Sequence, residues 1–329
     1  YNRIYNVKKI HRTTHNKSLS LFGRKLENPL GPAAGPNTQL AQNIVASYVG
    51  GARCIELKTV QIMYGEELGI PRPCINSVDE AYNVEWSAEY RCDKAAEEYI
   101  KAWFAIHLIA KEYNLGDPHG FMFIMSVGYN LAGIQSELVD DFIETMRHGK
   151  QSPMWNECKQ WALDNLHKFE NIDIDYINSI SDEICVAITL STMHGCPAEE
   201  IESICTYLMK DKGLNLYLKC NPTLLGPKTV RQLLDDAGFK YIEFDEHQFD
   251  VDLKFDAAIP MLERLLAVGA DAGVVFGVKL TNTFPVAIHN HELPGEQMYM
   301  SGKSLLPLTV GVAQLLSSHF GSRLPISYR

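Results

Sequence analysis

The 329-residue chain lacks the features that mark membrane proteins and nucleic-acid-binding proteins. It has no run of about 18 consecutive apolar residues, the length that a membrane-spanning helix needs. Positive charge is also scarce, because 30 lysines and arginines face 40 aspartates and glutamates and the formal net charge is −10. A nucleic-acid binder needs a basic face to displace counterions. The sequence therefore predicts no membrane span and no nucleic-acid partner.

The eight cysteines lack the spacing of a metal site. No two of them form the C-x-x-C pair of zinc ribbons and iron–sulfur loops, so we predict no metal in this chain. Cys54 and Cys185 lie inside strand-like apolar runs, where a free thiol behaves as a small hydrophobe. This use of cysteine is typical of a cytoplasmic protein. His289-x-His291 has no third ligand nearby, and we interpret it as a loop.

What the chain does have is the composition of a soluble globular protein. Hydrophobic residues make up 46% and charged residues 21%, and the length suits two medium domains or one large α/β barrel. The first residue is Tyr1, so we expect the natural chain to begin earlier. Residues 1–20 are predicted to form an N-terminal arm. The basic cluster from Arg3 to Lys25 either is solvated or docks on an acidic partner surface.

Short apolar runs alternate with amphipathic helical patterns along the chain. The predicted strands are Pro29–Ala34, Cys54–Val60, Phe121–Val127, Ile184–Ser191, Leu214–Cys220, Val274–Thr281 and Leu324–Tyr328, with Tyr241–Asp245 competing to be strand six. The predicted helices are Gln39–Val49, Ala88–Tyr113, Ile134–Arg147, Glu199–Lys212, Thr229–Ala237, Ala257–Val268 and Ser304–Phe320. Continuous apolar strands separated by single helices predict a parallel α/β fold.

Glycines and polar residues gather where the predicted strands end. In a (β/α)₈ TIM barrel this end of the strands carries the active site. No G-x-G-x-x-G opens a helix, so a dinucleotide-binding fold lacks its phosphate fingerprint. We therefore predict an α/β protein of the (β/α)₈ barrel class over residues 21–329. Residues 150–182, rich in aromatic and charged side chains, are predicted to be an insertion.

Three lysines follow apolar strands: Lys58, Lys219 and Lys279. A lysine in a barrel mouth can form a Schiff base or hold the anionic part of a cofactor. Each one alone is also consistent with a strand-end lysine that faces solvent, but the recurrence favours a site. A Schiff-base lyase remains an alternative, although it gives no role to Thr281–Thr283 or to Ser301-Gly302.

Asparagines recur at the same strand ends. An asparagine side chain offers both donors and an acceptor, which suits recognition of an amide-bearing ring, while each one alone is also typical of a turn. The candidates are Asn76, Asn83, Asn130, Asn221 and Asn282.

The loop Thr189–Pro197 brings hydroxyls, an imidazole and a thiol together directly after a predicted strand. A positioned group of this kind can donate or remove a proton opposite a redox cofactor. The candidates are Thr192 and Cys196, although Cys196-Pro197 also fits the start of a helix. Gly302 precedes another helix, where free N–H groups favour a phosphate, but this signal is weak.

Together these segments resemble the FMN-binding barrel of dihydroorotate and dihydropyrimidine dehydrogenases. The resemblance implies that FMN is bound by Ala34, Gly35, Lys58, Thr59, Asn130, Lys219, Ser301 and Gly302. It further implies a planar nitrogen heterocycle as substrate, held by Asn83, Asn282 and Thr283. The motifs that carry the resemblance are Asn28–Gly35, Glu56–Thr59, Asn83–Ser87, Met125–Asn130, Leu218–Asn221, Thr281–Thr283 and Ser301-Gly302.

The sequence is more similar still to the N-terminal barrel of selenate reductase subunits of the YgfK type. That branch implies iron–sulfur clusters, FAD and NADPH in a portion outside this chain. It also implies a molybdenum hydroxylase partner and a link to purine or selenium metabolism. The motifs are Gly31–Pro36, Thr38–Ile44, Ile55–Gln61, Thr189–Pro197 and Met298–Gly302.

Two residues depart from the pyrimidine enzymes of this family. Thr192 stands where they carry an acidic cysteine, and Thr189 stands where they carry an asparagine. Either Thr192 or Cys196 would then handle the proton. We also expect the chain to stop after strand seven, with the eighth strand and part of the phosphate cradle lying beyond Arg329. The sequence thus predicts an FMN-dependent oxidoreductase module. The alternative is a catalytically degenerate barrel that serves as a docking or electron-relay scaffold.

Overall fold

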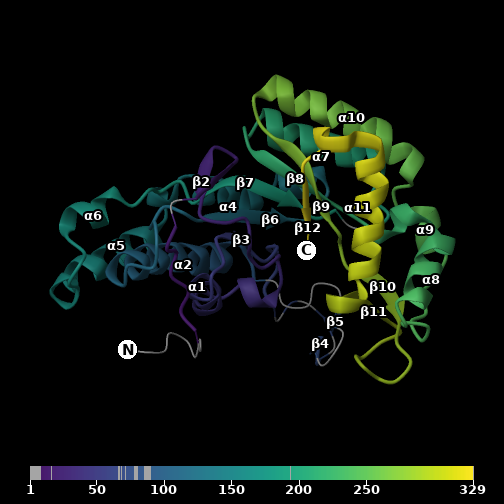
Figure 1. The fold of residues 1–329 in the computed structure, drawn as a ribbon, viewed down its shortest axis with the longest axis horizontal. Coiled ribbons are helices and arrows are strands. Elements are labelled where there is room, and N and C mark those ends of the chain that lie inside the picture. Colours follow the sequence, from purple (N-terminus) through teal and green to yellow (C-terminus); the bar gives the residue numbers. More distant parts are fainter. Residues whose placement is uncertain are drawn as a thin grey trace. The chain divides into compact units, whose positions relative to one another are not determined.

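The computed structural model describes residues 9–15, 17–65, 67, 69–70, 72–77, 81–84, 90–192 and 194–328. Two compact units make up the chain, and their elements are labelled in Figure 1. The first unit comprises Tyr1–Met63, Glu89–Val127 and Gln135–Ile188. The second unit comprises Tyr64–Ala88, Gly128–Ile134 and Thr189–Arg329.

The first unit combines a small hairpin with parallel strands and helices. Its hairpin pairs β1 with β2, and its parallel strands have the order β7-β6-β3. The strands are β1 (Leu19–Leu21), β2 (Arg24–Leu26), β3 (Cys54–Glu56), β6 (Met122–Val127) and the first residues of β7 (Cys185–Leu190). The helices are η1 (Pro36–Thr38), α1 (Ala41–Val49), α2 (Cys92–Glu112), α4 (Glu137–Arg147), η2 (Gly149–Gln151), α5 (Pro153–Asp164), η3 (Leu166–Lys168) and α6 (Ile174–Ser179).

The second unit contains a parallel and an antiparallel sheet. Its parallel strands have the order β12-β9-β8-β7, and its antiparallel strands the order β10-β11-β5-β4. The strands are β4 (Ile75–Ser77), β5 (Ala81–Asn83), the end of β7, β8 (Asn215–Cys220), β9 (Phe276–Leu280), β10 (Phe284–Ala287), β11 (Gln297–Ser301) and β12 (Ile326–Tyr328). The helices are α3 (Leu131–Ile134), α7 (Ala198–Lys210), η4 (Pro222–Leu225), α8 (Pro227–Asp236), α9 (Gln248–Val251), α10 (Phe255–Ala272), η5 (Gly302–Ser304), α11 (Leu306–Phe320) and η6 (Gly321–Arg323).

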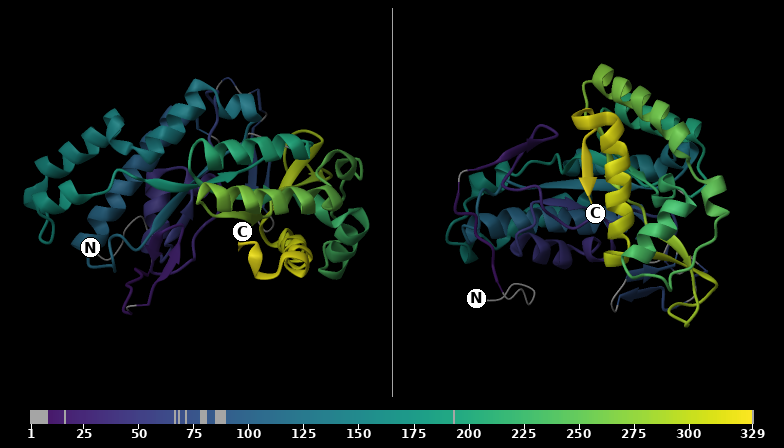
Figure 2. Two further views of the ribbon diagram at one scale, coloured as in Figure 1. Left: turned by 90° about the horizontal axis from the view of Figure 1, so that it is seen from above. Right: turned by 45° about the vertical axis from the view of Figure 1, so that its right-hand side comes forward.

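Most of the parallel strands are largely buried, as continuous apolar runs predict, whereas the edge strand β12 is partly exposed. Every residue of β6 and of β9 is buried. Helices α7 and α10 pack against each other, and each contacts a strand of the parallel sheet, β8 and β9 respectively (Figure 2). Strands β7, β8 and β9 are neighbours in this sheet and run in the same direction. Their carboxyl ends therefore lie next to one another.

The first predicted strand, Pro29–Ala34, is not a regular strand. The segment accepts backbone hydrogen bonds at Leu30 O from the N–H groups of Arg53 (2.8 Å) and Cys54 (3.1 Å), and at Pro32 O from Glu56 (3.1 Å). It therefore lies beside β3 in an extended form. Pro29 and Pro32 have no N–H to donate, which explains why the ladder is incomplete.

The two candidates for strand six have different structures. Tyr241–Asp245 forms no strand, whereas Val274–Thr281 contains β9, which pairs in parallel with both β8 and β12. The preference for Val274–Thr281 is therefore confirmed. The strand predicted at Leu324–Tyr328 is present as β12.

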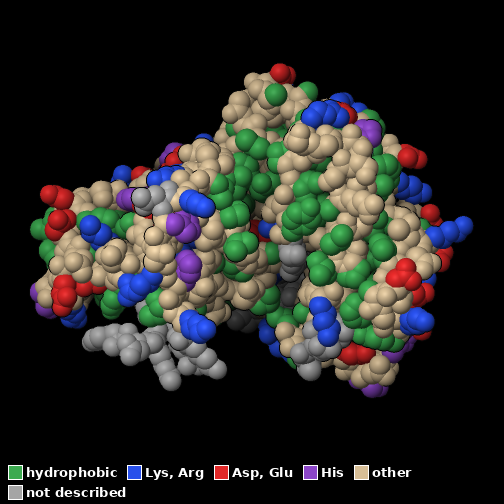
Figure 3. All heavy atoms as spheres, in the orientation of Figure 1, with side chains coloured by type: hydrophobic (Ala, Val, Ile, Leu, Met, Phe, Trp, Pro, Cys, Tyr) green, Lys and Arg blue, Asp and Glu red, His purple; other side chains and the backbone are tan. Residues whose placement is uncertain are grey.

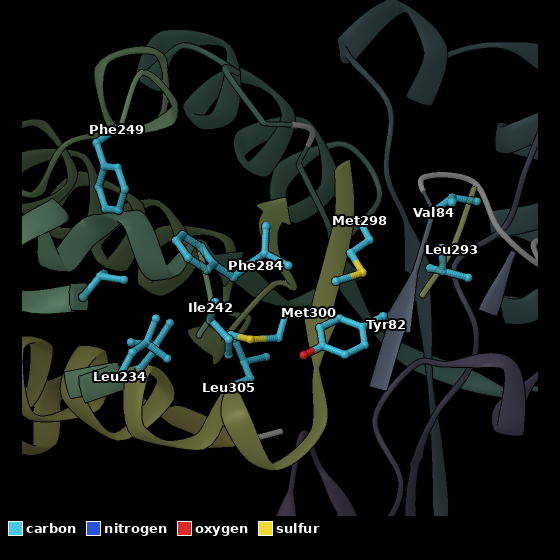
Figure 4. Close-up of a cluster of buried hydrophobic side chains, with 13 residues drawn as sticks. Tyr82, Val84, Leu234, Ile242, Phe249, Phe284, Leu293, Met298, Met300 and Leu305 are labelled. Atoms are coloured by element: carbon cyan, nitrogen blue, oxygen red, sulfur yellow. The ribbon is translucent and has the colours of Figure 1, made fainter. Parts of the chain in front are cut away.

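The antiparallel sheet of the second unit was not predicted. Its strands come from segments far apart in the sequence, and a hydrophobic cluster of its own holds it against α8 and α11 (Figure 4). Met298 and Met300 of β11 point into this cluster beside Phe284 of β10 and Leu305. The apolar contacts fix the position of β11 and of its partner β5.

The predicted insertion, residues 150–182, is mostly helical and contains α5 and α6. Trp155 of α5 is buried and packs edge-on against Phe104 of α2, with ring centroids 4.5 Å apart. Part of the predicted N-terminal arm also contacts the first unit. The N–H of His11 donates to Val49 O (2.9 Å), and that of Thr13 donates to Leu115 O (3.1 Å).

Lysine and arginine side chains are interspersed with acidic ones on the face that Figure 3 shows.

No helix in the described part of the chain has the length and apolar character needed to cross a bilayer.

The close approach of the Gly31 segment to β3 gives the first testable prediction. A Cβ at Gly31 would lie 1.7 Å from the carbonyl oxygen of Cys54, so Gly31→Ala must push the two backbones apart. We expect this variant to lose roughly 1–3 kcal/mol of unfolding free energy, or more, in urea titrations. Gly50→Ala in the same unit is the control, because its Cβ would make ordinary contacts of 3.4 Å. If the two variants unfold at equal free energy, the close packing of Gly31 against Cys54 is wrong.

Candidate active site

A buried carboxylate, Asp252, lies at the centre of the polar residues of the second unit. It follows α9, and its side chain is only 1% exposed. Five donors contact its two oxygens. Oδ2 accepts from His194 Nδ1 (2.9 Å), Thr223 Oγ1 (2.9 Å) and Asn221 Nδ2 (3.1 Å), and Oδ1 accepts from the Gly195 N–H (2.7 Å) and Gln248 Nε2 (3.1 Å).

These contacts keep Asp252 ionised. Burial by itself raises the pKa of the carboxyl group. The hydrogen bond and charge of His194, with the Gly195 N–H and the Thr223 hydroxyl, outweigh this effect and hold the pKa of Asp252 below its ordinary value. At neutral pH the group is therefore a carboxylate whose partners must all act as donors.

The network continues from Asp252 to the ends of β7 and β9. Asn221 follows β8, and its Oδ1 accepts a hydrogen bond from Asn282 Nδ2 (2.9 Å). Asn282 follows β9, and its Oδ1 accepts from Ser191 Oγ (3.0 Å). The structure thus joins Asn282, a predicted substrate-binding residue, to the loops after three neighbouring strands.

Both predicted proton-handling residues line one small cavity. Thr192, Cys196 and Lys219 surround it together with Asn221 and Asp252, and its volume is ≈ 20 Å³. This is about the space that one water molecule needs. The structure thus brings these three predicted site residues to one cavity, and their roles stay predictions.

The Cys196 thiol is poorly suited to ionise in this cavity. Burial, with a smaller contribution from the charge of Glu200, raises its pKa to about 11. At neutral pH the group is a protonated thiol.

Two lysines lie side by side at the end of the parallel sheet. Lys219 of β8 and Lys279 of β9 occupy partnered register positions, so their side chains share one face of the sheet. They are 4% and 6% exposed. The two lysines therefore place their side chains next to each other on one buried face at this end of the sheet.

Asn83 and Ser301 belong to the antiparallel sheet, and Gly302 directly follows it. Asn83 of β5 lies opposite Tyr299 of β11, and its Nδ2 donates to Val84 O (2.9 Å). The Tyr299 ring in turn lies 5.7 Å from the His194 ring, measured between centroids. The sheet thereby reaches the Asp252 network. Residues 85–87 of the predicted Asn83–Ser87 motif lie outside the described residues.

The turn after β11 is closely packed against β5. Ser301 Oγ donates to Ala81 O (3.1 Å), and Gly302 has φ of +75°. A Cβ at Gly302 would lie 3.2 Å from the Ala81 nitrogen. Glycine is therefore favoured at this position by both backbone conformation and space.

Two predicted residues stand apart from this network. Asn130 is exposed, and its Oδ1 accepts the Gly133 N–H (2.9 Å), so its side chain supports the short helix α3. Thr283 is half-buried and makes no side-chain hydrogen bond within the described ranges. For Asn130, the interpretation as a turn residue fits the observed contact.

The first unit brings its four predicted cofactor residues together. The N–H of Gly35 donates to Thr38 Oγ1 (3.2 Å), and the N–H of Lys58 donates to Thr38 O (3.2 Å). The N–H of Ala34 donates to the buried Glu56 (3.0 Å). Thr59, next to Lys58, shares a 2.8 Å hydrogen bond with Ser126 of β6.

The sequence analysis missed Asp252, Thr223 and Gln248. Asp252 lies 58 residues after His194 in a segment with several other acidic residues, so no local pattern marks it out. His194 was recognised as part of the Thr189–Pro197 loop but was not selected as a site residue. Among the described residues, no group of three or more His, Cys, Asp or Glu could hold a metal ion.

Comparisons with known proteins assign this chain to a family. Residues 5–329 match the family model described as "Oxidoreductase YgfK, N-terminal TIM-barrel domain". The chain is 46% identical over 328 residues to "Putative oxidoreductase YgfK" of Escherichia coli (strain K12), and equally to the protein of that name in Escherichia coli O157:H7. The alignment covers 95% of this chain but 31% of each relative, so the chain spans about a third of their length.

One solved structure gives a weaker similarity. Dihydroorotate dehydrogenase (DHODH) of Eimeria tenella, in complex with ferulenol, aligns with a TM-score of 0.48 and 13% identity. The alignment covers 94% of this chain and 72% of that chain. The predicted TIM-barrel fold and the YgfK-type resemblance are confirmed by the family match.

The ionisation of Asp252 gives a second testable prediction. Because its folded-state pKa lies below the ordinary value of 3.8, its stabilising effect is complete above that value and is lost as the pH falls through the lower, folded-state pKa. We expect Asp252→Asn to be clearly less stable than the wild type at about pH 7, with a smaller difference at about pH 3. Urea unfolding at both pH values measures the difference. If the difference in unfolding free energy between the two proteins is as large at about pH 3 as at about pH 7, Asp252 is not held as a carboxylate by its partners.

Proposed function

Since the chain belongs to the family of the oxidoreductase YgfK N-terminal TIM-barrel domain, we propose that it is an FMN-dependent oxidoreductase module. It passes electrons between the flavin and a planar nitrogen heterocycle or a partner redox centre. The observation that carries this proposal is the pair of buried lysines, Lys219 and Lys279, at partnered positions beside the Asp252 network.

The described residues suit a flavin in two respects. FMN supplies a hydride and electron acceptor whose reduced form is anionic, and buried ammonium groups stabilise such a charge. In addition, the Thr189 hydroxyl at the end of β7 is buried and has no hydrogen-bond partner among the described residues. A buried polar atom of this kind can be satisfied by a ligand.

The residues proposed to contact the flavin are those that the family resemblance implies. In the first unit these are Ala34, Gly35, Lys58 and Thr59, which share hydrogen bonds through Thr38, Glu56 and Ser126. In the second unit they are Asn130, Lys219, Ser301 and Gly302. Lys58 and Lys219 would neutralise negative charge on the reduced flavin, and Ser301 and Gly302 would hold its phosphate.

The substrate is proposed to be an amide-containing ring. Asn282 presents one N–H and one oxygen lone pair beyond those used by Asn221 and Ser191, so it can read a ring amide without breaking the network. Asn83 and Thr283 complete the proposed substrate contacts.

The longer relatives suggest a larger redox assembly. The portion beyond this chain is proposed to hold iron–sulfur clusters, FAD and an NADPH site, and a molybdenum hydroxylase is the proposed partner. Selenate reduction or purine metabolism is the proposed setting, in the cytoplasm.

A second candidate function is a docking or electron-relay scaffold. It is favoured by the Cys196 thiol, whose pKa of about 11 makes it a weak acid, and by Thr192 at the position of an acidic cysteine. Such a scaffold would bind flavin yet turn over no pyrimidine or purine.

Flavin binding gives a third testable prediction. The natural full-length protein, reconstituted with FMN, should show the visible flavin bands, and Lys219→Met should weaken FMN affinity at least about 10-fold through loss of a buried charge. Lys228→Met on the exposed side of α8 is the matched control and should bind like the wild type. Fluorescence titration measures each affinity.

Two results would count against the proposal. One is the absence of flavin bands from the wild-type protein after FMN addition. The other is equal loss of affinity in the Lys219 and Lys228 variants, which would make the effect one of net charge and not of the site.

A further inference from the structure

The buried carboxylate Asp252 fixes the protonation of the ring beside it. Oδ2 lies 2.9 Å from His194 Nδ1, and an ionised carboxylate only accepts hydrogen bonds. Nδ1 must therefore carry a proton. Asn221 Nδ2, 3.4 Å from the same nitrogen, does not compete, because it donates to Oδ2 itself (3.1 Å).

The other ring nitrogen is left as the acceptor. With its Nδ1 proton directed at Asp252, a neutral imidazole has a lone pair at Nε2. Nε2 has no hydrogen bond among the described residues, and the side chain is 17% exposed. Tyr299 lies beside the ring, with a centroid distance of 5.7 Å. The orientation of the His194 ring is thus fixed from its Nδ1 side, and Nε2 is the nitrogen that can accept a proton.

The rival groups in the same loop are less suited to exchange protons. The Cys196 thiol has its pKa raised to about 11, mainly by burial. Thr192 offers a neutral hydroxyl, which is a weaker acid than a thiol. Imidazole alone among the three normally changes charge near neutral pH.

We propose that His194, oriented by Asp252, is the proton-transfer residue of this site, in place of Thr192 or Cys196. This assignment rests on the oxidoreductase function proposed above. In the oxidising direction, bound FMN would accept a hydride from the heterocycle, and the proton on the neighbouring ring atom would pass to His194 Nε2. The electron pair of the broken bond to that proton forms the new double bond. Asp252 is a positioning residue that stabilises the resulting imidazolium.

The tautomer of His194 is the first measurement, and it needs no flavin. Nitrogen chemical shifts of ¹⁵N-histidine-labelled protein, assigned with His194→Gln, should show a protonated Nδ1 and a bare Nε2. A proton on Nε2 in the neutral wild-type ring would overturn the proposal.

Asp252→Asn provides a sharper form of this test. The backbone N–H of Gly195 can only donate, so the oxygen of the new amide must stay at the Oδ1 position. Its NH₂ group then occupies the Oδ2 position and donates to His194 Nδ1, while Asn221 Nδ2 loses its acceptor there. The ring should switch to the Nε2–H tautomer in this variant, and a ring that keeps its Nδ1 proton would contradict the orienting role.

Reduction of bound flavin is the fourth testable prediction. In stopped-flow experiments on the full-length FMN protein, dihydropyrimidines and reduced purines serve as probes. We expect His194→Gln to slow the reduction by roughly 10²–10⁴-fold, and Asp252→Asn to slow it as well. Cys196→Ser and Thr192→Val should slow it less than His194→Gln does, and the exposed control Lys228→Met should stay within about 3-fold of wild type. Melting curves identify a variant that fails to fold, and the tautomer measurement on Asp252→Asn keeps the proposal testable in that case.

The two proposals fail in different ways. If no probe reduces the flavin of the wild-type protein, the proposed function is wrong, and the tautomer measurements still decide whether Asp252 orients His194. If the flavin is reduced at equal rates with and without His194, or if only the Cys196 or Thr192 variant is slow, the proton assignment is wrong and the oxidoreductase function stands.

Discussion

The polar site of the second unit depends on one buried anion. Asp252 accepts five hydrogen bonds, and these reach the loop after β7, the residues after β8 and the helix α9. A carboxylate in such a place is tolerated only when its lone pairs are satisfied, because desolvation of an unpaired charge is very costly. Each partner must therefore direct a donor hydrogen at an oxygen of Asp252. This requirement fixes the tautomer of His194 and the orientation of the Asn221 amide.

Asn221 links Asp252 to residues farther from the carboxylate by hydrogen bonds. Its oxygen accepts from Asn282, whose own oxygen accepts from Ser191. Loops that follow three neighbouring parallel strands are thereby tied to one another by side chains, although loop backbones are usually mobile. A site built in this way is preorganised, since its polar groups do not have to reorient when a charge appears or disappears.

A second, apolar constraint places the antiparallel sheet. The buried Met298 and Met300 alternate with Tyr299 along β11, so anchoring the two methionines in the cluster turns Tyr299 to the opposite face. Tyr299 reaches the His194 ring on that face. Hydrophobic packing and the carboxylate network therefore act on the same imidazole from different directions.

The sequence by itself determined the class of the fold and much of the site. Continuous apolar runs in the sequence indicate buried parallel strands. The family motifs marked Lys219, Thr192, Cys196 and Asn282, and the structure brings these residues close together or links them by hydrogen bonds. Only the tertiary structure decided that Asp252 is the anchor, that the prolines prevent a regular first strand, and that β4, β5, β10 and β11 pair. Each of these depends on contacts between residues far apart in the chain, and such contacts leave no local pattern or periodicity to read.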